Sequence, residues 1–258
     1  MKKSVNISLF GTGNLAWKLG EALVHAGYTI QAVWGRNRSN RDALARLLEA
    51  DSIAKIEEMP VTRLRFLAVS DGAIADLATR LLPEQNSLLV HAAGSGSLSW
   101  LEPHPGRGIF WPLQSIHKER TYDWKQIPLL VDAAKADDRQ LLLEMGSSLS
   151  EKCFVADEKQ RQLYHLAAVC TANFSNLLYG ETFDLLRSEG LDHRLLLPIL
   201  QSQLHAFGSE QSPHKRQTGP AARGDLATLE HQLQLLDNQA ELAAIYRLLS
   251  EIIRLKQA

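Results

Sequence analysis

"LFGTGNLAWKL", residues 9–19, joins an apolar run to an amphipathic stretch. The run Val5–Phe10 predicts a strand, and Asn14–Ala26 predicts the helix that follows it. Gly11 permits a tight turn between the two, and Gly13 lets a phosphate approach the backbone, where the helix start offers N–H groups. Ala16, in place of a third glycine, is still small enough for close packing of helix on strand. The stretch therefore predicts a dinucleotide-binding turn made by Gly11, Thr12, Gly13, Asn14 and Leu15.

The loop after the second predicted strand indicates which dinucleotide is bound. In NAD-preferring proteins an acidic residue at this strand end binds the ribose 2′-hydroxyl, whereas arginine accommodates a 2′-phosphate. Here the strand Thr29–Trp34 is followed by Gly-Arg-Asn-Arg-Ser, with no acidic residue. Guanidinium groups offer fork-shaped donors to an anion. We expect NADP(H), held by Arg36, Asn37, Arg38 and Ser39; a merely solvated basic loop is the alternative.

The first half of the chain alternates strand-like and helix-like runs, which predicts a parallel sheet with helices on both faces. The predicted strands are Val5–Phe10, Thr29–Trp34, Ser52–Ile56, Leu64–Ser70, Ser87–Ala92, Gly108–Trp111 and Pro128–Asp132. The predicted helices are Asn14–Ala26, Ser39–Glu49, Asp71–Leu82 and Lys135–Leu149. We interpret residues 1–152 as a Rossmann-like α/β domain.

From residue 153 to 258 the patterns are helical, which predicts an all-α second domain. Its first helix, Asp157–Ser188, carries no charged side chain from Leu163 to Gly180 and is expected to be buried nearly all round. About 105 residues form a small domain for so much apolar surface, so a second subunit is expected to supply cover. The predicted assembly is a homodimer through the helical domain.

Composition excludes several function classes. A net charge of −1 over 258 residues argues against a nucleic-acid-coating surface. No apolar run reaches the ~18 residues of a membrane span. The two cysteines, Cys153 and Cys170, form no Cys-x-x-Cys pair and suggest neither a disulfide framework nor a zinc site. We expect a cytoplasmic protein without a bound metal.

Four further motifs carry a resemblance to a known family: "HAAGSGSL" (91–98), "GIFWPLQSI" (108–116), "LYHLAAVCTANFSNLLY" (163–179) and "QTGPAARGD" (217–225). Over nearly its whole length the chain is similar to a bacterial family of incompletely characterised NADP oxidoreductases. The first domain also resembles that of pyrroline-5-carboxylate reductase, 6-phosphogluconate dehydrogenase and 3-hydroxyisobutyrate dehydrogenase. The resemblance implies a Rossmann-like domain, a C-terminal domain of the 6-phosphogluconate dehydrogenase type, a dimer and an active site between the domains. It also implies that "FLAVSDGAIADLATRL" (66–81), with Val69 and Ser70, borders the nicotinamide side of the cofactor.

In the hydroxyacid dehydrogenase relatives a lysine and an asparagine one turn apart on the central helix serve the reaction. The resemblance places the asparagine at Asn173 but puts Val169 at the lysine position. His165, one turn earlier, is the nearest substitute, because imidazole transfers protons near neutral pH. A histidine that merely packs in an uncharged helix is the alternative. Asn176 is a second amide that needs a partner, either substrate or protein.

Other side chains are predicted to line the substrate side of the cleft. His91 lies at the carboxyl end of the fifth predicted strand, where ligands bind in open α/β sheets, and Ser95 follows in a glycine-rich turn. The stretch Trp111-Pro112-Leu113-Gln114 would supply an apolar wall, although a Trp-Pro pair also packs loops. Arg223 would bind an anionic group, or pair with a neighbouring aspartate.

Two functions from different classes follow. The first is an NADP-dependent oxidoreductase that acts on a small substrate, with or without a carboxylate, with the cofactor supplying the hydride. The second is a nucleotide-binding sensor or scaffold whose catalytic residues have been lost, which the valine at position 169 favours. Reduction of a deazaflavin is a third and weaker alternative.

Overall fold

The computed structural model describes residues 5–208 and 212–257 and divides into two compact units. The first ends at Ala168 and the second begins at Val169. This division lies beyond the boundary predicted at residue 152, because helix α5 (Glu158–Ala168) anchors to the sheet through the fully buried Arg161. The predicted domain boundary itself stays a prediction, and each unit is described by itself.

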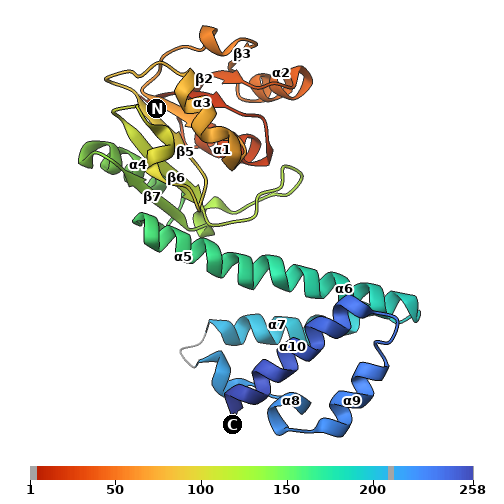
Figure 1. Cartoon of the computed structure of the whole chain (residues 1–258). Coiled ribbons are helices and arrows are strands. Elements are labelled where there is room, and N and C mark those ends of the chain that lie inside the picture. Colours follow the sequence, from red (N-terminus) through yellow and green to blue (C-terminus); the bar gives the residue numbers. More distant parts are fainter. Residues whose placement is uncertain (1–4, 209–211, 258) are drawn as a thin grey trace. The chain divides into compact units, whose positions relative to one another are not determined.

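An eight-stranded sheet forms the centre of the first unit (Figure 1). Its order is β3-β2-β1-β4-β5-β6-β7-β8, and every neighbouring pair is parallel except β6 and β7. The chain order reverses between β1 and β4, which is where α/β sheets bind ligands. The strands are β1 (Asn6–Phe10), β2 (Thr29–Trp34), β3 (Asp51–Ile53), β4 (Leu64–Leu67), β5 (Leu88–His91), β6 (Arg107–Pro112), β7 (Leu129–Ala133) and β8 (Cys153–Val155).

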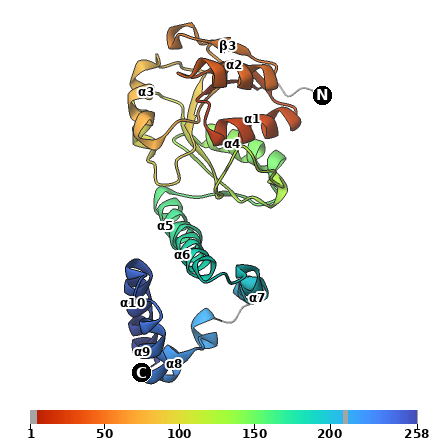
Figure 2. The same cartoon turned by 90° about the vertical axis from the view of Figure 1, so that its right-hand side faces the viewer.

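Helices cover both faces of this sheet because successive side chains of a strand point to opposite faces. In β1, Leu9 packs in the cluster that includes helices α1, α2 and α4, whereas Phe10 packs with α3 on the other face. Figure 2 shows α1 and α4 on one side of the sheet and α3 on the other. The helices are α1 (Asn14–His25), α2 (Arg38–Leu47), α3 (Ile74–Arg80) and α4 (Ala136–Leu149), with the 3₁₀ turns η1 (Ile56–Glu58), η2 (Asp71–Ala73), η3 (Leu98–Leu101) and η4 (Trp124–Gln126).

The second unit is helical. A small hydrophobic cluster centred on Leu236, Leu242 and Ala243 packs against Leu185 and Tyr246. The mostly parallel sheet followed by this helical region confirms the predicted fold class. The elements are the π-helical η5 (Val169–Asn173), α6 (Phe174–Ser188), η6 (His193–Leu196), α7 (Leu197–Phe207), η7 (Pro213–Arg216), α8 (Pro220–Arg223), α9 (Leu226–Gln234) and α10 (Ala240–Gln257).

Two expectations for the second half of the chain are wrong. Residues 153–155 form a strand, β8, where only helices were expected, because three residues are too short to show an alternating pattern. The uncharged stretch from Leu163 to Gly180 is not buried nearly all round. Leu166 is 58% exposed and Phe174 56%, since the hydrophobic cluster of the described second unit includes only Leu185 from this long helix.

The long helix is also interrupted by the π-helical η5. A π turn bonds residue i to i+5 and so adds one residue, which rotates the following side chains by about 100° relative to a regular α-helix. A single helical wheel therefore does not describe both α5 and α6. Val169 and Asn173 are the first and last residues of this segment, and their correspondence to the relatives' lysine and asparagine stays a prediction. No described helix is both long enough and apolar enough to cross a membrane.

Candidate nucleotide-binding site

A cavity of about 500 Å³ lies at the carboxyl ends of β1, β2 and β4 in the first unit. The parallel register brings these ends together, because Phe10 pairs with both Trp34 and Leu67. Nine of the eleven residues predicted to hold the cofactor line it. Its lining is Gly11, Thr12, Gly13, Asn14, Leu15, Trp34, Gly35, Arg36, Asn37, Ala68, Val69, Ser70, Ala73, Asp76, Leu77 and Arg80.

The turn after β1 depends on glycine at position 11. Gly11 has a φ of +119°, and a Cβ there would lie 2.1 Å from the carbonyl oxygen of Ala68. Its N–H donates to the Trp34 carbonyl at 2.8 Å, while the Ala68 N–H donates to the Phe10 carbonyl at 2.7 Å. The chain can therefore make this turn, which links three strand ends, only with a residue that lacks a side chain.

The start of α1 is free to receive an anion. Gly13 is the N-cap, no side chain caps the first turn, and no acidic residue lies in it. A Cβ on Gly13 would meet no described atom within 4 Å, so the space beside the backbone is open. Helix N-termini present unpaired N–H groups and a partial positive charge. This geometry suits a pyrophosphate group.

The loop after β2 carries Arg36 into the cavity lining. Arg36 is exposed and makes no ion pair within the described chain. The loop below it is fixed: a Cβ on Gly35 would lie 2.5 Å from Thr12 Cγ2, so loop and turn pack directly together. Asn37 closes the loop by accepting the Asn40 N–H at 2.9 Å as the N-cap of α2. Arg36 thus carries an unpaired guanidinium on a loop that these contacts hold in place.

Arg41 supplies that support and was missed by the sequence reasoning. Its side chain is buried, and it donates to the Gly35 carbonyl at 3.2 Å and to Ser52 Oγ at 2.9 Å. It also contacts the Asp42 carboxylate at 3.3 Å. The only sequence signal was an arginine at an inward position of α2, one turn after the loop.

Arg38 and Ser39 are not among the lining residues. Arg38 contacts the Asp42 carboxylate at 3.5 Å with its side chain 87% exposed, and Ser39 is exposed in the first turn of α2. Their contact with a phosphate stays a prediction. Two charged residues that were not predicted, Asp76 and Arg80, line the cavity from α3.

The residues predicted at the carboxyl ends of β5 and β6 also gather in the first unit. His91 is fully buried; it accepts the Ala93 N–H through Nδ1 at 3.1 Å and contacts the Ser97 carbonyl through Nε2 at 3.2 Å. Burial lowers its pKa to about 4, so the ring is neutral. It therefore supports the following loop from beneath, and it could contact a substrate only if that loop moved.

Ser95 and His165 lie at the same edge of the sheet. Ser95 Oγ donates to Asp71 Oδ2 at 3.5 Å, where Asp71 directly follows the lining residue Ser70. His165 packs on Trp111 with ring centroids 5.8 Å apart, which brings two predicted site residues together. Gln114 is exposed, and its side-chain oxygen accepts the Ser115 N–H.

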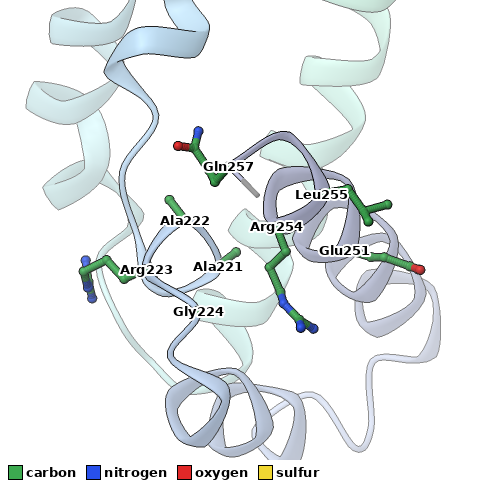
Figure 3. A pocket seen from close by; sticks show the side chains of 8 residues that line it. All are labelled: Ala221, Ala222, Arg223, Gly224, Glu251, Arg254, Leu255 and Gln257. Carbon is green, nitrogen blue, oxygen red and sulfur yellow. The ribbon is translucent and has the colours of Figure 1, made fainter.

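The remaining predicted residues belong to the second unit. Asn173 and Asn176 are exposed. Arg223 borders a cavity of about 450 Å³ together with Arg254, Glu251 and Gln257. Figure 3 shows Arg223 extending away from Arg254, so the two guanidiniums do not converge on one point. Among the described residues, no three histidine, cysteine or acidic side chains cluster to hold a metal.

Comparison with known proteins gives matches in sequence and in structure. Residues 127–253 match the model of a domain of unknown function, DUF2520. A Bacteroides fragilis protein, provisionally described as an NADP oxidoreductase, is 33% identical over 97% of this chain and 98% of its own, with a TM-score of 0.89. No curated protein is detectably similar in sequence.

More distant structures share the fold. A variant imine reductase from Myxococcus stipitatus, in complex with NAD⁺, is 18% identical with a TM-score of 0.67, over 97% of this chain and 94% of its own. Plasmodium falciparum pyrroline carboxylate reductase, with NADP bound, is 14% identical with a TM-score of 0.61 over all of both chains.

Proposed function

The chain belongs to the bacterial NADP oxidoreductase family of its Bacteroides fragilis relative, and on this premise we propose that it transfers hydride between NADP(H) and a small substrate. The observation that carries the proposal is the unpaired Arg36 in the cavity lining. It occupies the strand end where an acidic residue would bind the ribose of NAD. The cofactor would supply the hydride, and the chain would bind and orient it.

The residues present fit the cofactor at each end of the cavity. The open start of α1 suits the pyrophosphate, and Arg36 suits a phosphate on the ribose. Neither Arg36 nor Arg80 makes an ion pair within the described chain, so both guanidiniums are available to a ligand. Among folds of this kind both NAD⁺ and NADP occur, so the preference rests on Arg36.

For the substrate side, we propose His165 and Asn173 as the catalytic side chains, with Asn176 and Arg223 toward the substrate. His165 is partly exposed, so its ring is accessible to a proton acceptor. Arg223 is exposed and would suit a carboxylate. Ser95, His91, Trp111 and Gln114 would form or support the wall near the reacting end of the cofactor.

The test is a titration of the purified chain with NADPH and NADH. We expect NADPH to bind at least about tenfold more tightly, because a hydrogen bond to a charged group contributes about 1.5–3 kcal/mol. Arg36→Ala should remove the preference, whereas the matched variant Arg46→Ala should change either affinity less than about threefold, because Arg46 is exposed on α2 and lies outside the lining. Equal affinities for NADPH and NADH in the parent protein would refute the proposed preference.

A second function, a nucleotide-binding sensor or scaffold without catalysis, is favoured by Val169 at the position of the relatives' lysine. Deuterated NADPH distinguishes the two functions. Transfer of deuterium to a carbonyl or imine compound in a panel of small metabolites supports the oxidoreductase. Tight NADPH binding without transfer to any member of the panel supports the sensor.

We further propose a homodimer through the helical unit. Several apolar side chains there are more than half exposed in the single chain, including Leu177 of α6 and Leu204 and Phe207 of α7. Exposed apolar surface of this extent is typical of protein interfaces. Sedimentation should give a mass of about twice 28.7 kDa. A monomer at micromolar concentration would contradict this assembly.

The cytoplasmic location also remains a proposal. Cys153 and Cys170 are free thiols, which suits a reducing compartment. Burial raises the pKa of the Cys153 thiol to about 11, so this residue is a packing group rather than a nucleophile.

A further inference from the structure

A fully buried arginine joins helix α5 to the loop that follows β5. We call residues 92–97 the β5 loop. Arg161 has no exposed surface, and its guanidinium donates to the Gly96 carbonyl at 3.2 Å, the Asp132 carboxylate at 3.2 Å and the Ala156 carbonyl at 2.8 Å. One side chain thus links α5, β7 and the β5 loop.

Two other side chains hold the same loop. His91 contacts it at both ends, through the Ala93 N–H and the Ser97 carbonyl. Glu158, one turn before Arg161 on α5, accepts the Ser97 hydroxyl at 2.8 Å. The loop is therefore held from beneath by the strand and from the side by the helix.

The glycines of the loop are required by this packing. A Cβ on Gly94 would lie 2.4 Å from the Trp111 ring, and a Cβ on Gly96 would lie 2.5 Å from His91 Cε1. Each glycine backbone therefore lies directly on an aromatic ring. The loop is fitted to this surface, which leaves Ser95 facing Asp71 beside the nucleotide cavity.

Burying the charged Arg161 in the core costs more free energy than burying an apolar side chain there. Burial lowers its pKa, and its Nε–H finds no partner in the described chain. Replacing a buried ion pair by well-packed apolar residues is often neutral or stabilising. What an apolar side chain could not provide is a directed donor to the Gly96 carbonyl.

We propose that Arg161 is a positioning residue that fixes the β5 loop, and with it Ser95, at the reacting end of the nucleotide cavity. The inference rests on the proposed function, because that function places the nicotinamide at this edge of the sheet. Arg161 itself touches no ligand; it acts through the Gly96 carbonyl.

The variant Arg161→Met tests this role, with Arg139→Met as the matched control. Arg139 also binds Asp132, at 3.2 Å, but donates its other contact to the Ala133 carbonyl and does not touch the loop. Hydrogen exchange of the peptide containing residues 92–97 is measured in the cofactor-free protein. We expect exchange at least tenfold faster in Arg161→Met and within twofold of the parent in Arg139→Met. Unchanged exchange in Arg161→Met, or an equal increase in both variants, would overturn the proposal.

The second readout is the fluorescence of bound NADPH. We expect Arg161→Met to bind NADPH within threefold of the parent, because the turn and Arg36 are untouched, while the emission of the bound nicotinamide shifts toward that of free NADPH. An unchanged emission spectrum would overturn the link between the loop and the reacting end. If the parent itself failed to bind NADPH, the proposed function would fail, while the exchange result would still decide whether Arg161 holds the loop.

Arg161→Lys covers the case in which the methionine variant does not fold. Lysine keeps the charge, but its single ammonium replaces the fork that reaches Gly96 and Asp132 together. Faster loop exchange in a folded Arg161→Lys protein supports the proposal, and parent-like exchange contradicts it.

Discussion

The cavity at the carboxyl ends of β1, β2 and β4 and the β5 loop lie at the same edge of one sheet, but their charged side chains are used in opposite ways. In the cavity, Arg36 and Arg80 are exposed and make no ion pair within the described chain. At the loop, His91 and Arg161 are fully buried and bonded to backbone carbonyls. Groups left unpaired are available to bind a ligand, whereas groups bonded within the protein hold the binding surface in place.

The same contrast separates the glycines. Gly11 and Gly13 belong to the cavity, and Gly13 faces open space that a phosphate could fill. Gly94 and Gly96 belong to the loop, and each faces an aromatic ring instead. A glycine-rich stretch at the end of a strand therefore need not be a ligand-binding stretch.

The largest expected effect on stability comes from a substitution in the turn between β1 and α1, on which the cavity depends. Gly11→Ala should lower the free energy of unfolding by about 4 kcal/mol, because a left-handed φ and a contact with the Ala68 carbonyl both oppose a side chain. Gly13→Ala should leave stability nearly unchanged yet weaken NADPH binding, since the new methyl group would occupy the phosphate space. Urea unfolding and NADPH titration of both variants measure this. A stable, NADPH-binding Gly11→Ala protein would contradict the assigned geometry.

The second prediction concerns His91 beneath the β5 loop and the pH dependence of stability that it causes. The pKa of His91 falls from 6.5 to about 4 on folding, so the unfolded chain takes up a proton first as the pH drops. His91 therefore contributes stability fully above pH 6.5, and about 3 kcal/mol of it is lost as the pH falls from 6.5 to 4. His104, whose pKa burial also lowers, changes in the same direction.

Urea unfolding at pH 7 and pH 4.5 measures the effect. His91→Gln should be less stable than the parent at pH 7 but should lose clearly less stability between the two pH values. An identical pH dependence in parent and variant would show that His91 is not held neutral.

The smallest effect tests whether phosphate binding by Arg36, the unpaired arginine of the cavity, depends on the buried Arg41. Arg41→Met removes the donor to the Gly35 carbonyl and should weaken NADPH binding roughly tenfold, equivalent to about 1.4 kcal/mol, because the loop under Arg36 is no longer fixed. NADH binding should change less than threefold. Arg46→Met, an exposed change on the same helix, is the control. Equal losses for the two cofactors would mean that Arg41 supports the whole fold rather than the phosphate end.

The cavity could be predicted because its parts are neighbours in the sequence. Gly11 to Leu15 form one turn, and Arg36 and Asn37 follow one strand, so local pattern located seven of the lining residues, and the family resemblance added Val69 and Ser70. Asp76 and Arg80 of the lining were missed, and so was Arg41, which donates to the Gly35 carbonyl. Only the packing of α2 and α3 against the strand ends brings these three side chains to the cavity or to its loop.

The β5 loop could not be read in the same way. Arg161 lies 65 residues beyond Gly96, and nothing in a helical charge pattern shows that one arginine of α5 is buried against that loop. The π-helical segment η5 could not be predicted from the sequence either, because a single added residue does not change the apolar character of the stretch.

By itself, the sequence determined the alternating strand and helix order, the glycine turn after the first strand and the missing acidic residue, because these depend on contacts within about thirty residues. Only the tertiary structure decided which arginines lack an ion pair and which are hydrogen-bonded within the protein. That choice depends on burial and on hydrogen-bond partners from distant segments, which leave Arg36 unpaired in the cavity lining and bond Arg41 and Arg161 within the protein.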